Sequence, residues 1–439
     1  MSPKASPSRT HPAAWVPTLY FAEGLPFYAV NLMALTFYQR MGVDNATNTM
    51  VISNLGWLWT LKPLWSPLLE MFKTKKYFVV LFQFIGGLAL TALALSLPLA
   101  CYFRYSIALL LVIGFCSSSH DIAADGLYIA SLTPKQQAAY TGWQGGFYNV
   151  ARFFSLGGLI FLAGYLTDRY TAAHASQPIV RAWMTIFASL GALLIGLSLY
   201  HWRMLPSGGE ERSSQGVRQM AATFWDVLDS FFRKPRILLL MVFIFLYRAG
   251  EGQVAKVGPL FLQAPRSLGG LGLSMQEFGS IYGGFGSGAF ILGSVLGGYF
   301  TAKLGLRRAL LPLLCVLNLP MLAYYYLSAA LPVNPALITA ALSVEMFGYG
   351  FGFVGVILLM MQEIAPGKYQ TAHYAFANSL MNLGLILPGS VSGVIQMKLG
   401  YRNFFLWVLL CAIPSLVMAR FIPLRGGSAA GGTAEPAAA

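Results

Sequence analysis

Residues 105–131 read YSIALLLVIGFCSSSHDIAADGLYIAS, an apolar stretch long enough to cross a membrane as a helix. Two carboxylates, Asp121 and Asp125, lie within it four residues apart, so a helix would place them on one face. A charge inside the hydrocarbon layer costs about 3 kcal/mol even on insertion scales, and is retained where it faces a watery cavity, finds a partner or carries a proton. This stretch predicts a helical membrane protein with a functional polar interior, and a transporter is the first candidate.

The composition of the whole chain supports this class. Of the 439 residues, 56% are hydrophobic and 10% are charged, and the mean hydropathy is +0.62, whereas about a quarter of a soluble domain is charged. We predict an all-α membrane protein in which twelve transmembrane helices form two six-helix halves. The predicted spans are 15–37, 48–70, 77–99, 105–131, 140–165, 181–203, 237–262, 275–301, 307–328, 334–361, 367–397 and 401–424.

Lys and Arg residues are unevenly divided between the two sides of these spans. Most of the 29 fall in the termini and in the loops on the same side as the termini, including the long loop at 204–236. The positive-inside rule then places both termini and this loop in the cytoplasm. Because this topology explains the net charge of +14, no nucleic-acid partner is expected.

The predicted topology divides the chain into five parts. A cytoplasmic tail (1–14) precedes the first half (15–203), and a cytoplasmic central loop (204–236) leads to the second half (237–424) and a disordered tail (425–439). The end of the central loop has the spacing of an amphipathic helix on the membrane surface, with a solvated linker as the alternative.

Internal repetition in the sequence supports the division into two halves. YFAEG at 20–24 and YRAGEG at 247–252 place Glu23 and Glu251 at corresponding points of the first and seventh spans. Duplicated halves of this kind are typical of the major facilitator superfamily fold, which we therefore predict for this chain. In that fold the substrate binds between the halves near the membrane midplane.

A degenerate motif joins the eighth and ninth spans and points to a gate. GYFTAKLGLRR at 298–308 is similar to the G-x-x-x-D-x-x-G-x-[RK]-[RK] signature of that superfamily, although Ala302 replaces its acid. The segment after the second span keeps an acid, Glu70, but lacks the glycines. We expect Glu70, Arg307 and Arg308 to act in gating.

Signatures of enzymes and metal centres are absent from the sequence. Its four Cys residues form no CxxC pair, and its five His residues are too sparse for a metal centre. No Walker sequence or nucleophile elbow is present. We expect no metal, no cofactor and no enzymatic activity.

Acids within the spans are the candidates for proton coupling. Two like charges brought close together in a low dielectric favour binding of a proton. A structural salt bridge to Arg152 or Lys62 is the alternative for Asp121 and Asp125, and an intrahelical pair with Arg248 is the alternative for Glu251. The predicted proton-coupling residues are Asp125, Asp121, Glu23 and Glu251.

Polar and aromatic side chains in the spans are candidates for binding the substrate, because rings stack on sugars and amides bond to hydroxyl and peptide groups. Arg152 is a candidate anchor for an anionic group, with a structural ion pair as the alternative. His120 is interpreted as structural or as polar lining, and it could share the hydrogen-bond network of the acids. The predicted substrate-binding residues are Glu345, Arg152, Asn149, Tyr148, Gln144, Trp143, Asn378, Asn382 and His373.

Four short runs together resemble the AmpG-type muropeptide permeases and their major facilitator relatives. They are YFAEGLP (20–26), KPLWSP (62–67), DIAADG (121–126) and GYGFG (348–352), and the similarity extends over residues 17–424. The resemblance implies proton-driven import of anhydro-muropeptides across the inner membrane of Gram-negative bacteria. It also implies roles for Glu23, Asp121 and Asp125.

The chain departs from these permeases in one respect, since they often carry two additional helices beyond the twelve predicted here. Related branches of the superfamily include importers of siderophores and carriers of acetyl-coenzyme A. We expect a multi-pass, proton-coupled symporter of the bacterial inner membrane that works by alternating access. Its expected partners are a small sugar-peptide substrate, protons and the lipid bilayer. The alternatives are an importer of a siderophore or another amphiphile, and a membrane scaffold or signalling protein that transports nothing.

Overall fold

The computed structural model describes residues 11–66, 69, 74–208, 217–366, 369–422 and 424, and all regular elements in these ranges are helical. The first half contains α1 (Val16–Tyr28), η2 (Ala29–Met33), α2 (Ala34–Arg40), α3 (Asn45–Leu55), α4 (Trp57–Thr60), η3 (Lys62–Leu64), α6 (Lys75–Ser96), α7 (Tyr102–Ser131), α8 (Pro134–Arg152), η4 (Phe153–Leu159), α9 (Ile160–Ala172) and α10 (Pro178–Met204). The second half contains α12 (Ile237–Gln263), α13 (Met275–Phe278), η6 (Gly279–Phe285), α14 (Gly286–Leu304), α15 (Leu306–Asn318), α16 (Leu322–Ala330), α17 (Pro335–Leu359), η8 (Met360–Ile364) and α18 (Gln370–Met418).

Nine helical stretches of the described chain are individually long and apolar enough to cross a membrane. The last of them, α18, is two helices joined at Gly400, whose φ of 71° breaks the helix and suits a residue without a side chain. The first two spans are too short as single helices to meet this length criterion. The π-helical η2 interrupts the first span between α1 and α2, and the second is interrupted at Gly56 between α3 and α4. When α18 is counted as two spans and the two interrupted spans are added, the twelve predicted spans are confirmed.

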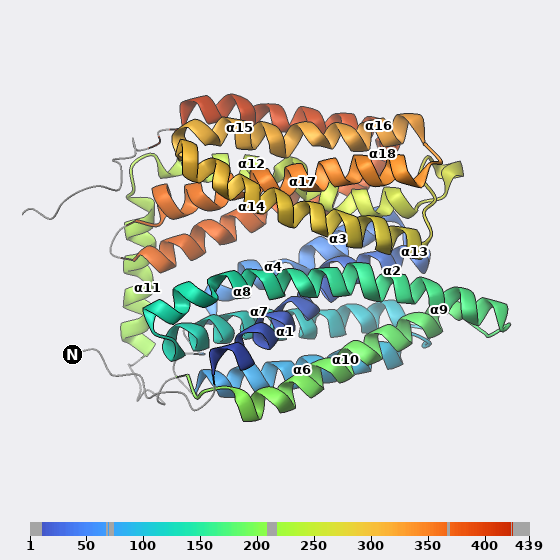
Figure 1. The fold of residues 1–439 in the computed structure, drawn as a ribbon, viewed down its shortest axis with the longest axis horizontal. Helices are drawn as coiled ribbons and strands as arrows, with labels where there is room; N and C mark the ends of the chain where they lie inside the picture. Colours follow the sequence, from blue (N-terminus) through green and yellow to red (C-terminus); the bar gives the residue numbers. More distant parts are fainter. Residues whose placement is uncertain are drawn as a thin grey trace, which may run out of the picture.

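The spans form two bundles that lie side by side in Figure 1. In the first half α6 packs between α7 and α10, and α1 packs on α8; in the second, α12 packs on α18, while α17 packs on α14 and α15. The predicted halves are therefore both present as helical bundles. The helix α11 (Val217–Phe232) crosses one end of the molecule, in the part of the central loop for which the sequence left a helix and a linker open.

The two halves meet through polar contacts at the end opposite α11, here called the far end. Arg40 at the end of α2 donates to the side chain of Gln263 over 3.3 Å, and Gln276 on α13 donates to Asp168 on α9. Asn45 at the start of α3 donates to Gln396 over 2.7 Å. These contacts hold the halves together at the far end.

The halves also touch backbone to backbone between η4 and η6. A Cβ atom on Gly283 would overlap the carbonyl carbon of Leu156, and one on Gly279 would lie 2.9 Å from the backbone nitrogen of Phe161. Glycine is thus required here for the two chains to approach so closely. A crevice of about 600 Å³ lies along this seam, between Phe153 and Phe285.

Candidate transport site

Three carboxylates of the first half gather around one another inside the bundle. Glu23 comes from α1, and Asp121 and Asp125 come from successive turns of α7. The Nζ atom of Lys62 lies 3.8 Å from Oδ2 of Asp121 and is within electrostatic range of the other two acids. Of the pairings that the sequence left open, the structure shows the one between Asp121 and Lys62.

Hydrogen bonds from α1 and α8 hold Asp125. The hydroxyl of Tyr20 donates to Oδ1 of Asp125 over 3.1 Å, and the amide of Gln144 donates to the Tyr20 hydroxyl and, over 3.5 Å, to the same carboxylate oxygen. Gln144, predicted as a substrate-binding residue, thereby joins the acidic cluster to the surface of α8. In the sequence Tyr20 was noted only as part of the YFAEG repeat, and no role for its hydroxyl was predicted.

Glu23, Asp121 and His120 have polar atoms that lie within 4.8 Å of one another. Glu23 Oε2, Asp121 Oδ1 and His120 Nδ1 are all buried and make no hydrogen bond within the described part of the chain. Buried polar atoms are nearly always satisfied, so unsatisfied atoms on three clustered side chains indicate a functional site. The sequence left His120 as a structural or polar-lining residue that could share the network of the acids, and the structure places it beside Glu23 and Asp121.

The corresponding acid of the second half, Glu251, has a different environment. Its Oε2 atom lies 3.0 Å from Nε of Arg248 one turn earlier on α12, and both side chains are almost fully buried. The guanidinium of Arg248 also lies over the ring of Phe353, 4.7 Å from its centroid. The intrahelical pair that the sequence offered as an alternative is present, so Glu251 is neutralised locally.

Arg152 at the end of α8 is buried between the two halves, with 6% of its surface exposed. Its guanidinium lies 4.6 Å from the centroid of the Phe290 ring, and Nη2 is 3.5 Å from the sulfur of Met346. In the described part of the chain no carboxylate oxygen lies within 4.0 Å of it, unlike Arg248. A buried guanidinium in this state can receive an anionic group.

Two other predicted substrate-binding residues lie on opposite sides of the seam between the halves, Tyr148 on α8 and Glu345 on α17. Tyr148 packs its ring against Phe27 and Tyr28 of α1, with ring centroids 6.1 and 5.6 Å apart. Glu345 on α17 is 4% exposed, and its Oε2 atom makes no hydrogen bond within the described ranges. Met346 beside it touches Arg152, so Glu345 and Arg152 lie on facing elements.

The remaining predicted residues make contacts of their own or are half-buried. Trp143 is 44% exposed and stacks on Phe147, while Asn149 donates to the backbone of Gly145 within its own helix. His373 is bonded to Ser230 of α11 over 3.0 Å. Asn378 and Asn382 are half-buried on α18.

The predicted gating residues lie at the end of the molecule that carries α11. Arg307 and Arg308 are exposed at the start of α15. Glu70 lies outside the described residues, as do the tails at 1–10 and 425–439 and the stretch 209–216 of the central loop. The gate therefore stays a prediction.

A multi-pass helical bundle with buried acids and a buried arginine between two halves has the architecture of a membrane transporter. The sequence profile of the Major Facilitator Superfamily matches residues 18–389, and the chain belongs to that family. The predicted fold and family are thus confirmed.

Curated relatives with the names of AmpG-type permeases match the chain, in agreement with the resemblance seen in the sequence. The anhydromuropeptide permease of Escherichia coli (strain K12) is 25% identical over 407 residues, which cover 91% of this chain and 77% of the relative. The putative transporter AmpG 4 of Rickettsia conorii is 20% identical over 419 residues, covering 92% of this chain and 94% of the relative.

Solved structures share the fold at lower identity. A bacterial homologue of the human lysosomal transporter Spinster superposes with a TM-score of 0.70 at 14% identity, covering 93% of this chain and 95% of the other. The nucleoside transporter NupG gives a TM-score of 0.67 at 16% identity, covering 93% and 97%.

Proposed function

We propose that this chain is a proton-coupled symporter that imports an anhydro-muropeptide, or a closely similar sugar-peptide, across the bacterial inner membrane. The observation that carries the proposal is the cluster of Glu23, Asp121 and Asp125 around Lys62, in which Asp121 is buried and Asp125 is exposed. Three carboxylates near this ammonium carry an excess of negative charge in a low dielectric, which protonation relieves. The excess gives the cluster a reason to bind a proton on one side of the membrane and to release it on the other.

The cargo is proposed from two observations. The curated relatives are named as an anhydromuropeptide permease and AmpG-type transporters, and Arg152 is a buried cation without a carboxylate partner within the described residues. A sugar-peptide of this class offers carboxylates that a guanidinium can bind in bidentate fashion. Tyr148 and Glu345 are proposed to line the same site, with Asn378 and Asn382 contributed by α18.

Coupling follows from alternating access. The contacts at the far end, such as Arg40 with Gln263, close that side of the molecule. In the proposed cycle these contacts break to admit substrate and a proton from the periplasm, and the halves then rock about the glycine seam. The distribution of Lys and Arg supports a cytoplasmic location for both termini and for α11.

Uptake of radiolabelled GlcNAc-anhydroMurNAc-peptide into proteoliposomes, with and without an inward proton gradient, tests the proposal. Accumulation that requires the gradient establishes both the cargo class and the source of energy. Absence of uptake beside a working control permease would refute the cargo, and a siderophore or another amphiphile would then be tried in the same vesicles.

A further inference from the structure

Glu23, His120 and Asp121 define a small polar centre beside Lys62 and Asp125. Because one ligand atom of each residue lies within 4.8 Å of the other two, a common point lies within about 2.8 Å of all three. That is the length of a hydrogen bond to water, and a buried water needs two to four such partners. The centre therefore has the size and the donor set of a site for one water molecule.

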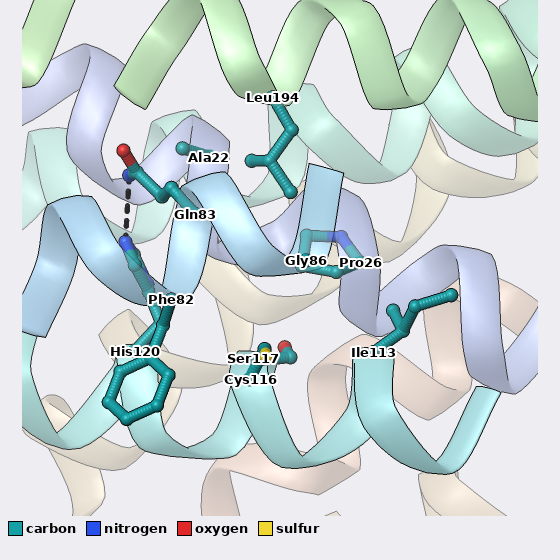
Figure 2. A pocket seen from close by; sticks show the side chains of 10 residues that line it. All are labelled: Ala22, Pro26, Phe82, Gln83, Gly86, Ile113, Cys116, Ser117, His120 and Leu194. Carbon is teal, nitrogen blue, oxygen red and sulfur yellow. Dashed lines mark hydrogen bonds between the residues drawn. The ribbon is translucent and has the colours of Figure 1, made fainter. Parts of the chain in front are cut away.

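A chain of buried polar side chains fixes the ring of His120. The amide nitrogen of Gln83 on α6 lies 2.8 Å from Nε2 of His120, as Figure 2 shows, and its amide oxygen lies 2.8 Å from Nδ1 of His201 on α10. His201 Nε2 is in turn 3.0 Å from the hydroxyl of Thr18 on α1. Four helices of the first half are thus tied together behind the acids.

This chain also bears on the tautomer of His120. With the amide nitrogen of Gln83 facing Nε2 of His120, that ring nitrogen is the acceptor and carries no proton. The proton of a neutral imidazole is then on Nδ1, which is the ring nitrogen without a hydrogen bond in the described chain. His120 consequently presents a donor to the polar centre.

We propose that Glu23, His120 and Asp121 bind a single water or hydronium between them, and that His120 is a positioning residue for the transported proton. An arriving hydronium gives its proton to one carboxylate, where a new O–H bond forms, and remains as the water that bridges the other two groups. In the ionised state the Nδ1–H of His120 stabilises the centre through this water. This inference rests on the proposed proton coupling.

Charged and titratable groups from several elements face the centre. They are Lys62 from η3, Asp125 from α7, Tyr20 from α1 and Tyr148 from α8. On the side of Gln83 and His120 lies a cavity of about 10 Å³, close to the minimum for one water. Its walls include Phe82, Ile113 and Leu194 (Figure 2), which keep the hydrogen-bonded chain dry.

The test compares His120→Leu, which removes the donor, with His120→Asn, whose amide nitrogen takes the place of Nδ1. Gradient-driven uptake is measured against pH, beside counterflow exchange of labelled for unlabelled substrate, which needs no net proton movement. In His120→Leu the pH midpoint of uptake is expected to rise by about one unit, because the ionised centre loses a hydrogen bond. His120→Asn should restore most of the wild-type pH profile of uptake. Gln83→Leu removes the hydrogen bond that holds the His120 ring, and it should raise the pH midpoint as His120→Leu does.

The exposed His174 provides a matched control, since His174→Asn alters a loop residue and should leave the profile unchanged. Retained counterflow shows that each variant is folded. A His120→Leu profile that matches wild type would overturn the inference. Loss of uptake after treatment with EDTA would also overturn it, because a metal ion would then occupy the centre.

A second readout separates this inference from the proposed function. Nitrogen NMR of 15N-histidine-labelled protein reports the tautomer of His120 without any transport, and the five His residues of the chain make assignment by single substitution practical. A proton on Nδ1 supports the inference even if the cargo proposal fails, whereas a proton on Nε2 overturns it. Uptake that is independent of the gradient in the wild type would refute the proposed function alone.

Discussion

The ammonium of Lys62 lies 3.8 Å from the carboxylate of Asp121, at the edge of a cluster that also holds Glu23 and Asp125. Their side chains are 27% and 12% exposed, so the pair is poorly screened by solvent. Removing its cation leaves the carboxylates to repel one another.

Lys62→Met is accordingly expected to lower gradient-driven uptake by at least about tenfold, because carboxylates without their cation hold a proton too tightly to release it. Initial rates of labelled sugar-peptide uptake in proteoliposomes measure the effect. Lys398→Met, at an exposed position of α18, is the matched control and should be unaffected. Wild-type rates in Lys62→Met would remove this ion pair from the mechanism.

Asp125→Asn separates charge from hydrogen bonding at that position. The amide oxygen of Asn can still accept from Tyr20 and Gln144, so the local structure is kept while the charge is lost. Gradient-driven uptake is expected to fall about tenfold or more while counterflow stays within about twofold of wild type. If the variant accumulates substrate normally at equal expression, Asp125 does not carry the coupled proton.

Arg152 is expected to bind an anionic group of the substrate. A hydrogen bond to a charged group contributes about 1.5–3 kcal/mol, so Arg152→Gln should raise KM about tenfold or more with a smaller change in maximal rate. Arg402→Gln, an exposed arginine of α18, serves as control. A wild-type KM in Arg152→Gln, measured by uptake against substrate concentration, would assign Arg152 a structural role.

The glycine seam is expected to be required for closure of the far end. A methyl group at Gly283 would overlap the backbone of Leu156, whereas one at Gly288, on the same side of the crevice, meets nothing within 4 Å. Gly283→Ala should therefore destabilise the closed arrangement by about 1–3 kcal/mol and slow transport, and Gly288→Ala should do neither. Thermal unfolding in detergent and uptake rates measure both effects, and equal behaviour of the two variants would contradict this account of the seam.

Arg248 and Glu251 provide a test of a structural ion pair. Removing one partner of a buried pair costs about 3–5 kcal/mol, because the other charge is left uncompensated. Arg248→Met is thus expected to lower thermal stability more than the double variant Arg248→Met with Glu251→Gln, in which no charge remains. A double variant less stable than the single one would show that the pair itself, rather than charge balance, stabilises α12.

The sequence predicted the fold well because apolar length and loop charge depend on local composition. The boundary at Gly400 was placed within a few residues, since a glycine between two apolar runs is visible in the sequence. The first two spans were also predicted, although η2 and the break at Gly56 interrupt them in ways that no local pattern signals.

The site was predicted less completely, because it depends on how helices rotate against one another. Glu23 and Glu251 occupy corresponding positions in the repeats, yet Arg248 neutralises one of them and a cluster of acids surrounds the other. The sequence offered Arg152 and Lys62 equally as partners for Asp121, and packing decided for Lys62.

The hydrogen-bonded chain behind the acids had almost no sequence signal. Gln83 and His201 are 118 residues apart, and each is a single polar residue in an apolar span. A polar residue in a membrane helix suggests that it has a partner, but the partner becomes apparent only when α6, α7 and α10 are packed together.

Proton movement driven by substrate tests the central claim most directly. Wild-type proteoliposomes that contain a trapped pH-sensitive dye, and have no imposed gradient, are given an inward gradient of GlcNAc-anhydroMurNAc-peptide. The account predicts that the lumen acidifies as the peptide enters, and that Asp125→Asn abolishes this signal while still exchanging peptide. Entry of labelled peptide without acidification would contradict proton symport by this transporter.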